Sequence, residues 1–149
     1  YYFGSTEGLF LATLQSEIDV IDAETRDIPQ RRGPLKQLMV DALTYMMDRA
    51  RDQPHRMALL MRAEHEPDRG QPAFDFEKHR RAHHHELENL LRQGIERGEV
   101  RADVRVDDAV DLIVSYVERQ MCRMVVEGVP IPEDFPERAI DLFFRGVAA

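Results

Sequence analysis

Cysteine and tryptophan are nearly absent from this sequence, whose 149 residues include one cysteine and no tryptophan. A single cysteine cannot form a disulfide within the chain, which agrees with a reducing cytoplasm. Cys122 lies inside a predicted helix and is best interpreted as a small buried side chain. A redox-sensing thiol is the alternative, for which only Arg119 and Arg123 could supply a positive charge that lowers the thiol pKa.

Long hydrophobic runs are also missing. No segment approaches the ~20 consecutive apolar residues that a membrane helix needs, and no secretory signal pattern is present. The composition is 43% hydrophobic and 32% charged, which is typical of a globular chain of one domain. We therefore expect a soluble cytoplasmic protein that does not interact with membranes.

Positive charge is in deficit, because 20 lysines and arginines oppose 28 aspartates and glutamates and the formal net charge is -8 at pH 7. A surface of this sign repels phosphate groups. The sequence therefore excludes these residues as the main part of a nucleic-acid interface. If a binding pocket were lined by these acids, it would favour a cationic ligand.

Patterns typical of β-strands are absent too, because no stretch alternates between polar and apolar residues for long enough. Apolar residues instead recur at helical spacing between segments rich in proline and glycine. This pattern predicts an all-α bundle of about six helices, over residues 5–23, 34–51, 54–65, 74–97, 107–127 and 133–147. Gly98 is expected to end the fourth helix as a left-handed C-cap residue.

The helix predicted over residues 107–127 has two apolar stripes. The first contains Val110, Ile113, Val114, Val117, Met121, Met124 and Val125, and the second contains Ala109, Leu112 and Tyr116. A helix that is apolar on two sides must be covered on two sides. We expect its own core to cover one side and another element to cover the second.

Histidines form the densest group of possible metal ligands. His79 and His83 share a face of a predicted helix, with Glu86 one turn further on and His65 on the preceding helix. A helical metal-dependent enzyme is therefore one alternative function. The other interpretation places His83 in a core or pocket, because it falls within the apolar stripe of its helix.

The sequence contains little else that is typical of catalysis. Glu64, Glu66 and Glu86 could face a pocket, but no Ser–His–Asp order, phosphate-binding glycine loop or paired carboxylates are present. We therefore predict no catalytic residues, no cofactor and no enzymatic activity.

Methionine is frequent on the predicted apolar faces. The seven methionines are Met39, Met46, Met47, Met57, Met61, Met121 and Met124. Flexible thioethers can fill gaps in a core, or they can line an adaptable apolar cavity. Taken together, they favour a cavity.

The first ten residues, YYFGSTEGLF, show a specific order of residue types. Aromatic side chains precede Gly4, Ser5 can cap a new helix, and Glu7 places a negative charge in its first turn. In any all-helical protein this order could mark the end of one helix and a turn into the next. It is also similar to the tetracycline-repressor (TetR) family of bacterial regulators, in which the recognition helix ends in a Y-Y-[HYF]-F-x-S-K-E-x-L run. The RGEV turn at residues 97–100 resembles the corresponding turn of TetR-family ligand domains.

This resemblance implies that residues 1–4 are the end of the recognition helix of a helix-turn-helix and that residues 5–149 are a ligand-binding and dimerisation domain. Tyr1, Tyr2 and Thr6 are then the expected DNA contacts, to phosphates rather than bases. The family's usual lysine after the cap is Thr6 here, which can bond a phosphate oxygen but releases no counterion. The resemblance also implies that a basic reader module of about 35–50 residues precedes Tyr1.

A TetR-like regulator would act as a homodimer that binds operator DNA and is released by an apolar or amphipathic effector. The dimer interface is predicted to contain Val117, Met121, Val125, Leu142 and Phe143. The ligand pocket is predicted to contain Ile18, Met39, Leu43, Met46, Met61, His65, His83, Leu87, Val114 and Met121. A dimerisation module without a ligand is the second alternative.

Overall fold

Residues 4–149 are described by a computed structural model, and this part of the chain contains six α-helices and one short 3₁₀ helix. The α-helices are α1 (Thr6–Thr25), α2 (Leu35–Asp52), α3 (Pro54–His65), α4 (Phe76–Glu96), α5 (Val106–Val125) and α6 (Phe135–Val147). The predicted all-α class is confirmed, and each helix lies close to its predicted range. The 3₁₀ helix η1 (Ile28–Gln30) lies in a segment that was expected to be a loop.

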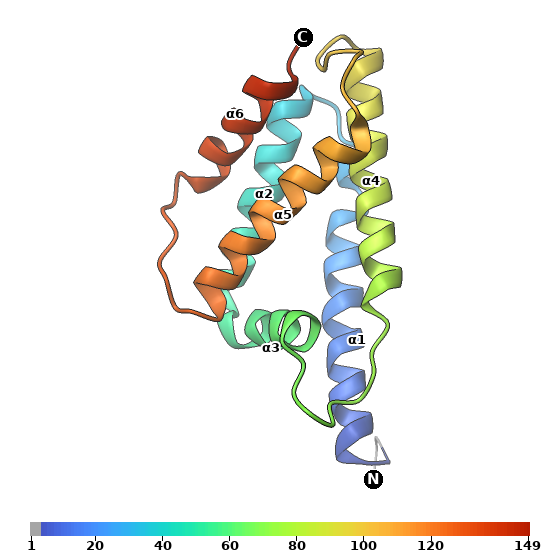
Figure 1. The fold of residues 1–149 in the computed structure, drawn as a ribbon, viewed down its shortest axis with the longest axis vertical. Helices are drawn as coiled ribbons and strands as arrows, with labels where there is room; N and C mark the ends of the chain where they lie inside the picture. Colours follow the sequence, from blue (N-terminus) through green and yellow to red (C-terminus); the bar gives the residue numbers. More distant parts are fainter. Residues whose placement is uncertain (1–3) are drawn as a thin grey trace.

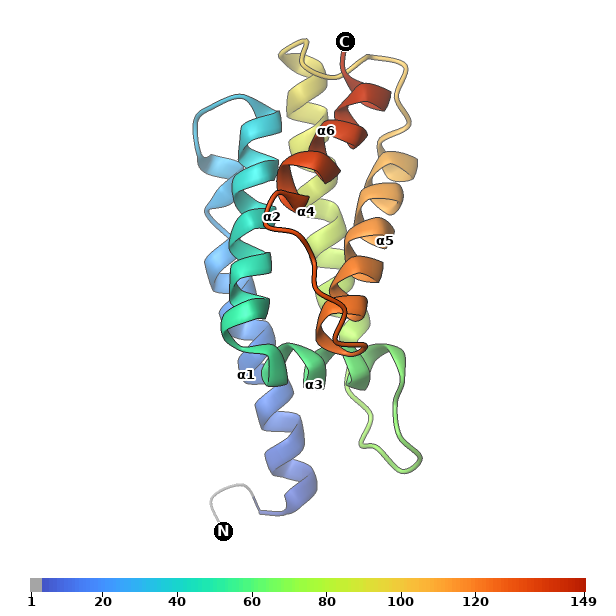
Figure 2. The same ribbon diagram turned by 90° about the vertical axis from the view of Figure 1, so that its left-hand side faces the viewer.

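The helices form a bundle in which α1 and α4 lie side by side along the long axis of the molecule (Figure 1). The α5 helix runs obliquely across α2, and α6 packs on α2. The short α3 helix crosses the lower end of the bundle, and α1 extends beyond it toward the N-terminus (Figure 2). Within residues 4–149, no helix combines the length and the apolar character that crossing a membrane requires.

Local residue chemistry explains where two of the long helices begin and end. Ser5 accepts a hydrogen bond from the backbone amide of Gly8 at 2.9 Å, as expected for the N-cap of α1. Asp75 accepts one from the amide of Lys78 at 3.3 Å and caps α4 in the same way. Gly98 has a φ of 73°, which confirms the predicted left-handed residue after α4.

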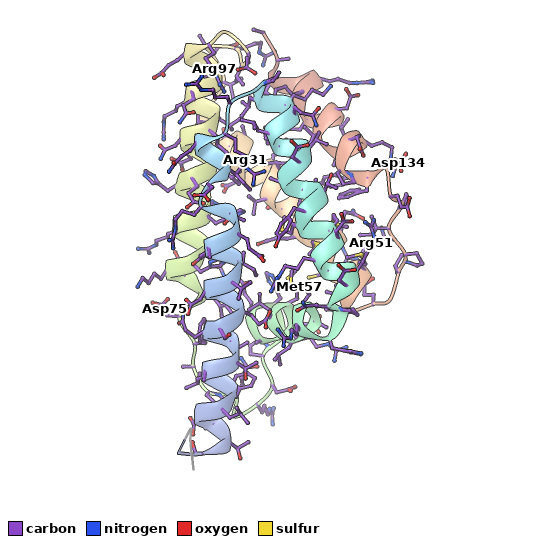
Figure 3. The ribbon with its side chains drawn as sticks, turned by 180° about the vertical axis from the view of Figure 1, so that it is seen from behind. Arg31, Arg51, Met57, Asp75, Arg97 and Asp134 are labelled. Atoms are coloured by element: carbon purple, nitrogen blue, oxygen red, sulfur yellow. The ribbon has the colours of Figure 1, made fainter. Side chains whose placement is uncertain are left out.

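Buried apolar side chains form two clusters. The larger cluster is built from α2, α4, α5 and α6, and α3 adds Met57 and Met61 to it. Figure 3 labels Met57 of α3 near one end of the bundle and Arg97, which follows α4, at the other end. The smaller cluster joins α1 to α3 and the start of α4, and its buried members are Leu14, Ile18, Leu60, Ala63 and Phe76. The α1 helix is therefore attached mainly through a separate, smaller set of apolar contacts.

The end of the bundle away from the N-terminus is closed by contacts between α2, α4 and the C-terminus. Gly94 of α4 lies so close to Leu35 that an added Cβ would be 2.5 Å from its Cδ2 atom. The Glu99 carboxylate accepts a hydrogen bond from the Leu35 amide at 2.6 Å and satisfies a free donor in the first turn of α2. Val100 forms an isolated antiparallel bridge with Ala148. These contacts make this end of the bundle tightly packed.

Candidate ligand-binding cavity

A cavity of about 200 Å³ lies inside the bundle and is lined by side chains from all six helices. Most of the lining is apolar. Ile21 and Thr25 of α1 contribute to its wall, and Ile140 of α6 is also part of the lining. A mostly apolar cavity with a few polar groups is the usual form of a small-molecule site.

Eight of the ten residues predicted for the pocket line this cavity. They are Met39, Leu43, Met46, Met61, His83, Leu87, Val114 and Met121. Ile18 does not, because it is buried in the smaller cluster with Leu60 and Phe76, and Ile21 takes its place one turn further along α1. His65 lies outside the cavity too, and lines a separate recess on the surface.

The methionines fulfil both of the roles considered for them. Five of them line the cavity, namely Met39, Met46, Met57, Met61 and Met121. Met47 is completely buried in the core instead, and Met124 packs against the core from outside the cavity. The thioethers on the cavity wall can change rotamer, so the cavity can adapt to the shape of a ligand.

His83 supplies a neutral polar group to the cavity. Burial lowers the pKa of His83 from 6.5 to about 4, and the neighbouring His79 and His84 act in the same direction. The imidazole is therefore uncharged at pH 7, and it offers one hydrogen-bond donor and one acceptor.

Three carboxylates line the cavity, from Glu64 of α3, Glu86 of α4 and Glu118 of α5. Glu64 accepts hydrogen bonds from Arg80 at 2.7 and 3.2 Å. Burial raises the pKa of Glu118, and the charge of Glu64 raises it further. Burial also raises the pKa of Glu86, and Asp22 of α1 acts in the same direction. The polar part of the cavity is thus mainly acidic.

The histidine pair does not form a recognisable metal centre. The rings of His79 and His83 are stacked, with centroids 6.4 Å apart, and the Nδ1 atom of His79 lies 2.9 Å from a carboxylate oxygen of Asp22. Across residues 4–149, no three histidine, cysteine or acidic side chains lie close enough together to hold a metal ion. The structure therefore provides no third ligand for the metal-dependent alternative.

A family model described as "Tetracyclin repressor-like, C-terminal domain" matches residues 29–143. The chain belongs to this family. No curated protein and no solved structure gave a match. The matched range covers the cavity-lining residues of α2 to α6 but excludes α1, whose first residues belong to the segment that resembles the TetR-family junction.

A second recess, of about 280 Å³, lies on the surface of this TetR-family domain between α3 and the second half of α5. Met61 and Glu118 line both the recess and the internal cavity, so the two are neighbours. Cys122 is part of the recess wall, and burial raises the pKa of its thiol. Because a redox-sensing cysteine needs a lowered pKa, this environment does not favour the redox alternative.

The residues exposed on α5 and α6 are not those that were predicted for the dimer interface. Val117, Met121 and Phe143 are buried in the core of the single subunit, so they are not available to a second copy. Val125 packs partly against the same core. Of the five predicted interface residues, Leu142 alone is largely exposed, at 65%.

Two residues of the second apolar stripe of α5 accompany Leu142 on the surface. Leu112 is 65% exposed and Tyr116 is 39% exposed. The sequence indicated that α5 has two apolar sides, but Val117 and Met121, which were predicted to face a second copy, are buried within the subunit. The stripe with more apolar residues faces the larger core, together with Ala109 of the shorter stripe, whose other two members lie at the surface.

The expected DNA contacts lie at the N-terminal end of the domain. Tyr1 and Tyr2 are outside the residues that the structure describes. Thr6 is the first residue of α1 and is exposed, at the end of the molecule where α1 extends beyond α3. Its position is compatible with a contact to a phosphate group.

Glu118 is the acidic cavity residue that was not predicted from the sequence. It follows Val114 by four residues on α5, so both lie on similar sides of the helix. That spacing was the available signal, because an acidic side chain beside an apolar stripe indicates a polar group near the core. Glu64 and Glu86 were considered as pocket residues and do line the cavity, whereas Glu66 lines the surface recess.

Proposed function

We propose that this domain binds a small-molecule effector in its internal cavity and thereby controls the DNA binding of a dimeric transcriptional repressor in the cytoplasm. The observation that carries the proposal is the cavity itself, which is apolar, adaptable and bordered by α1. Membership of the tetracycline repressor-like family supports the regulatory role. The domain has no part in catalysis under this proposal.

The exposed apolar face of α5 and α6 supports dimerisation. Leu112, Tyr116 and Leu142 are large apolar side chains that the subunit leaves uncovered. Burying such side chains against a second copy contributes roughly 25 cal/mol per Å² of apolar surface removed from water. A twofold pairing of these helices would place the same residues of both copies in one four-helix interface.

The α1 helix connects the cavity to the DNA-binding end of the molecule. Its second half supplies Ile21 and Thr25 to the cavity wall, and its first residue is Thr6, one of the proposed phosphate contacts. Residues 1–4 would be the end of a recognition helix, and residues 5–149 the effector and dimer domain. An effector that binds better to one tilt of α1 shifts the population toward that tilt.

Such a tilt would change the distance between the two reader modules of the dimer. Half-sites on DNA lie about 34–36 Å apart for modules that bind successive turns of one groove. A shift of a few ångströms at the reader end therefore weakens binding to the operator. The effector in this scheme releases the repressor from DNA.

The test is a DNA titration of the protein expressed with the residues that precede Tyr1 in its reading frame. We expect binding to operator DNA whose logarithmic affinity falls linearly with the logarithm of salt concentration, because phosphate contacts release counterions. Replacing Tyr1 by Phe together with Thr6 by Ala should weaken binding to operator and random DNA to a similar degree. Absence of DNA binding by the longer protein at low salt would contradict the regulatory role.

A further inference from the structure

The acidic groups of the cavity gather where α3, α4 and α5 meet. Glu118 of α5 is about half-buried, and within residues 4–149 its carboxylate forms no ion pair with a lysine, arginine or histidine. The charge of Glu64 is one cause of the raised pKa of Glu118, and the charges of His65, Arg80 and His84 act against it. A carboxylate held in this way is destabilised in its charged form, and a cation beside it would relieve that cost.

The charges that face the cavity do not cancel. Glu64, Glu86 and Glu118 contribute three carboxylates, whereas Arg80 contributes one guanidinium. The imidazole of His83 is neutral, as described above. The two other histidines of the lining each lie beside an aspartate, with His79 2.9 Å from Asp22 and His84 3.4 Å from Asp111. The cavity therefore has an excess of negative charge.

Arg80 does not close off the acidic end permanently. Its side chain is 43% exposed, and its Nη1 atom also donates a hydrogen bond to Glu77 at 3.0 Å. Arg80 can therefore stay paired with Glu77 on its own helix if a ligand takes its place at Glu64. The 12% exposure of the Glu64 side chain places that carboxylate in a poorly hydrated position, where an ionic contact is stronger than on the surface.

From these observations we propose that the effector is an amphipathic organic cation. Its apolar body would lie among the methionines and leucines of the cavity, and its positive group would lie between Glu118 and Glu64. This inference deepens the proposed function and rests on the cavity being the effector site.

Anionic and neutral ligands fit the cavity less well than a cation does. An anion would have to approach Glu118 and Glu64 with Arg80 as its only full positive partner, and Arg80 is already engaged with two acids. A neutral apolar ligand would gain from burial of its surface but would leave the Glu118 carboxylate uncompensated. Only a cation gains from both the apolar walls and the acidic end.

The surface recess provides a route for such a ligand. Recess and cavity share Met61 and Glu118. The recess wall also carries the acids Glu66 and Glu127 and the bases Arg62 and Arg119, and Arg119 pairs with Glu127. With three acids and two arginines, the recess wall attracts a cation only weakly. Met61 has an unbranched, flexible side chain that can rotate to connect the two spaces.

The test compares three probes with the same octyl chain, namely octyltrimethylammonium, octanol and octanoate, in calorimetric titrations of the purified protein at pH 7. The quaternary ammonium group carries a charge that does not titrate. We expect the dissociation constant of octyltrimethylammonium to be at least about tenfold lower than that of octanol, which corresponds to about 1.4 kcal/mol, and octanoate to bind most weakly.

Two variants test whether the preference for a cation arises from the carboxylate of Glu118. Glu118→Gln should weaken binding of octyltrimethylammonium at least about fivefold and leave octanol binding nearly unchanged, because it removes a charge-assisted contact and little volume. Glu137→Gln is the matched control, since Glu137 is an exposed acid on α6 outside the cavity and its substitution changes the net charge equally. It should alter none of the three affinities.

The outcomes separate this inference from the proposed function. If octanol binds as tightly as octyltrimethylammonium, or if Glu137→Gln weakens the cation as much as Glu118→Gln does, the charge preference is wrong while the cavity still stands as a ligand site. If none of the three probes binds, the cavity does not accept an apolar body, and the proposed function fails together with the inference.

Discussion

Glu17 of α1 and Arg49 of α2 form an ion pair of 3.2 Å, and both side chains are almost completely buried, with exposures of 5% and 11%. Arg49 also reaches Glu24 of α1 at 3.3 Å, and Arg56 of α3 reaches Glu17 at 3.1 Å. These contacts attach α1 to α2 and α3 just before and alongside the cavity residues Ile21 and Thr25. Any effector that tilts α1 has to move or rearrange this group.

Removing Arg49 should therefore destabilise the fold. In Arg49→Met the carboxylate of Glu17 keeps only the largely exposed Arg56 as a partner. Loss of one partner of a buried pair costs about 3–5 kcal/mol, and we expect the low end because Arg56 remains and because Arg49 Nε has no partner in the wild type. Urea unfolding followed by circular dichroism measures the change.

The matched control is Lys36→Met, which breaks the exposed pair between Lys36 and Asp141. That pair should contribute no more than about 1 kcal/mol. The double variant Glu17→Leu with Arg49→Met should recover most of the lost stability, since it leaves no unpaired charge. Equal effects of Arg49→Met and Lys36→Met would show that the buried pair does not hold α1.

The fold could be predicted from the sequence because its signals are local. Ser5 caps α1, Gly98 ends α4, and the apolar residues of each helix recur at helical spacing. Most of the cavity lining followed from the same spacing, since Met39, Leu43 and other lining residues lie on the inward stripes of their helices.

Long-range pairings could not be predicted in this way. Glu17 and Arg49 are separated by 32 positions, and neither shows a local pattern that indicates a buried pair. The orientation of α5 was assigned incorrectly because both of its stripes are apolar, and only packing decides that Val117 faces inward while Leu112 faces outward. The need for glycine at position 94 likewise depends on contacts made by a different helix.

Gly94→Ala should destabilise the domain through overpacking. The new methyl group would lie 2.5 Å from Leu35 Cδ2 and 2.9 Å from Val100 Cγ2, and both neighbours are buried in the core. Inserting a methyl group into such a site costs typically about 1–3 kcal/mol. Thermal unfolding provides the measurement.

Gly146→Ala serves as the comparison, because nothing lies within 4 Å of a Cβ at that position in α6. Alanine has the higher helix propensity, so this change should leave stability unchanged or raise it by up to about 1 kcal/mol. A stable Gly94→Ala variant would mean that α2 and α4 are not in close contact.

Acidification should lower the free energy of unfolding because His83 is buried in its neutral form. Its folded-state pKa of about 4 lies below the ordinary 6.5, so the unfolded chain binds the extra proton between these two values. The free energy of unfolding that His83 contributes is therefore complete above pH 6.5 and is lost as the pH falls toward 4, by about 3 kcal/mol in total. Desolvation is the main cause, with His79 and His84 adding to it and Asp22 opposing it.

The measurement is the free energy of unfolding of the wild type and of His83→Gln, each at pH 7 and at pH 4.5. Taking the difference between the two proteins removes the contribution of the other titratable groups, which both proteins share. We expect the wild type to lose more stability than the variant over this interval. Parallel pH profiles of the two proteins would place His83 in a well-hydrated position.

Leu142→Glu should convert a dimer into monomers. Leu142 is 65% exposed on α6 and would be buried by a second copy, so a charge there would lose both apolar contact and hydration. We expect the dissociation constant of the dimer to rise at least about thirtyfold, equivalent to about 2 kcal/mol. Sedimentation equilibrium measures it.

Leu9→Glu introduces the same charge at a leucine that is 47% exposed and belongs to α1, which is not part of the proposed α5–α6 interface. It should leave the dimer intact. A wild-type protein that sediments as a monomer at tens of micromolar would contradict the proposed interface.

The most direct measurement of an effector site in this cavity is a thermal-shift screen of small molecules on three proteins. They are the wild type, Ala42→Phe, which fills the cavity from α2, and Ala82→Phe, which places the same ring on the exposed side of α4. A ligand at 100 times its dissociation constant stabilises the wild type by about 2.7 kcal/mol. We predict compounds that stabilise the wild type and Ala82→Phe but not Ala42→Phe, with both variants shown to be folded by circular dichroism. Stabilisation that persists in Ala42→Phe would contradict a ligand site in this cavity.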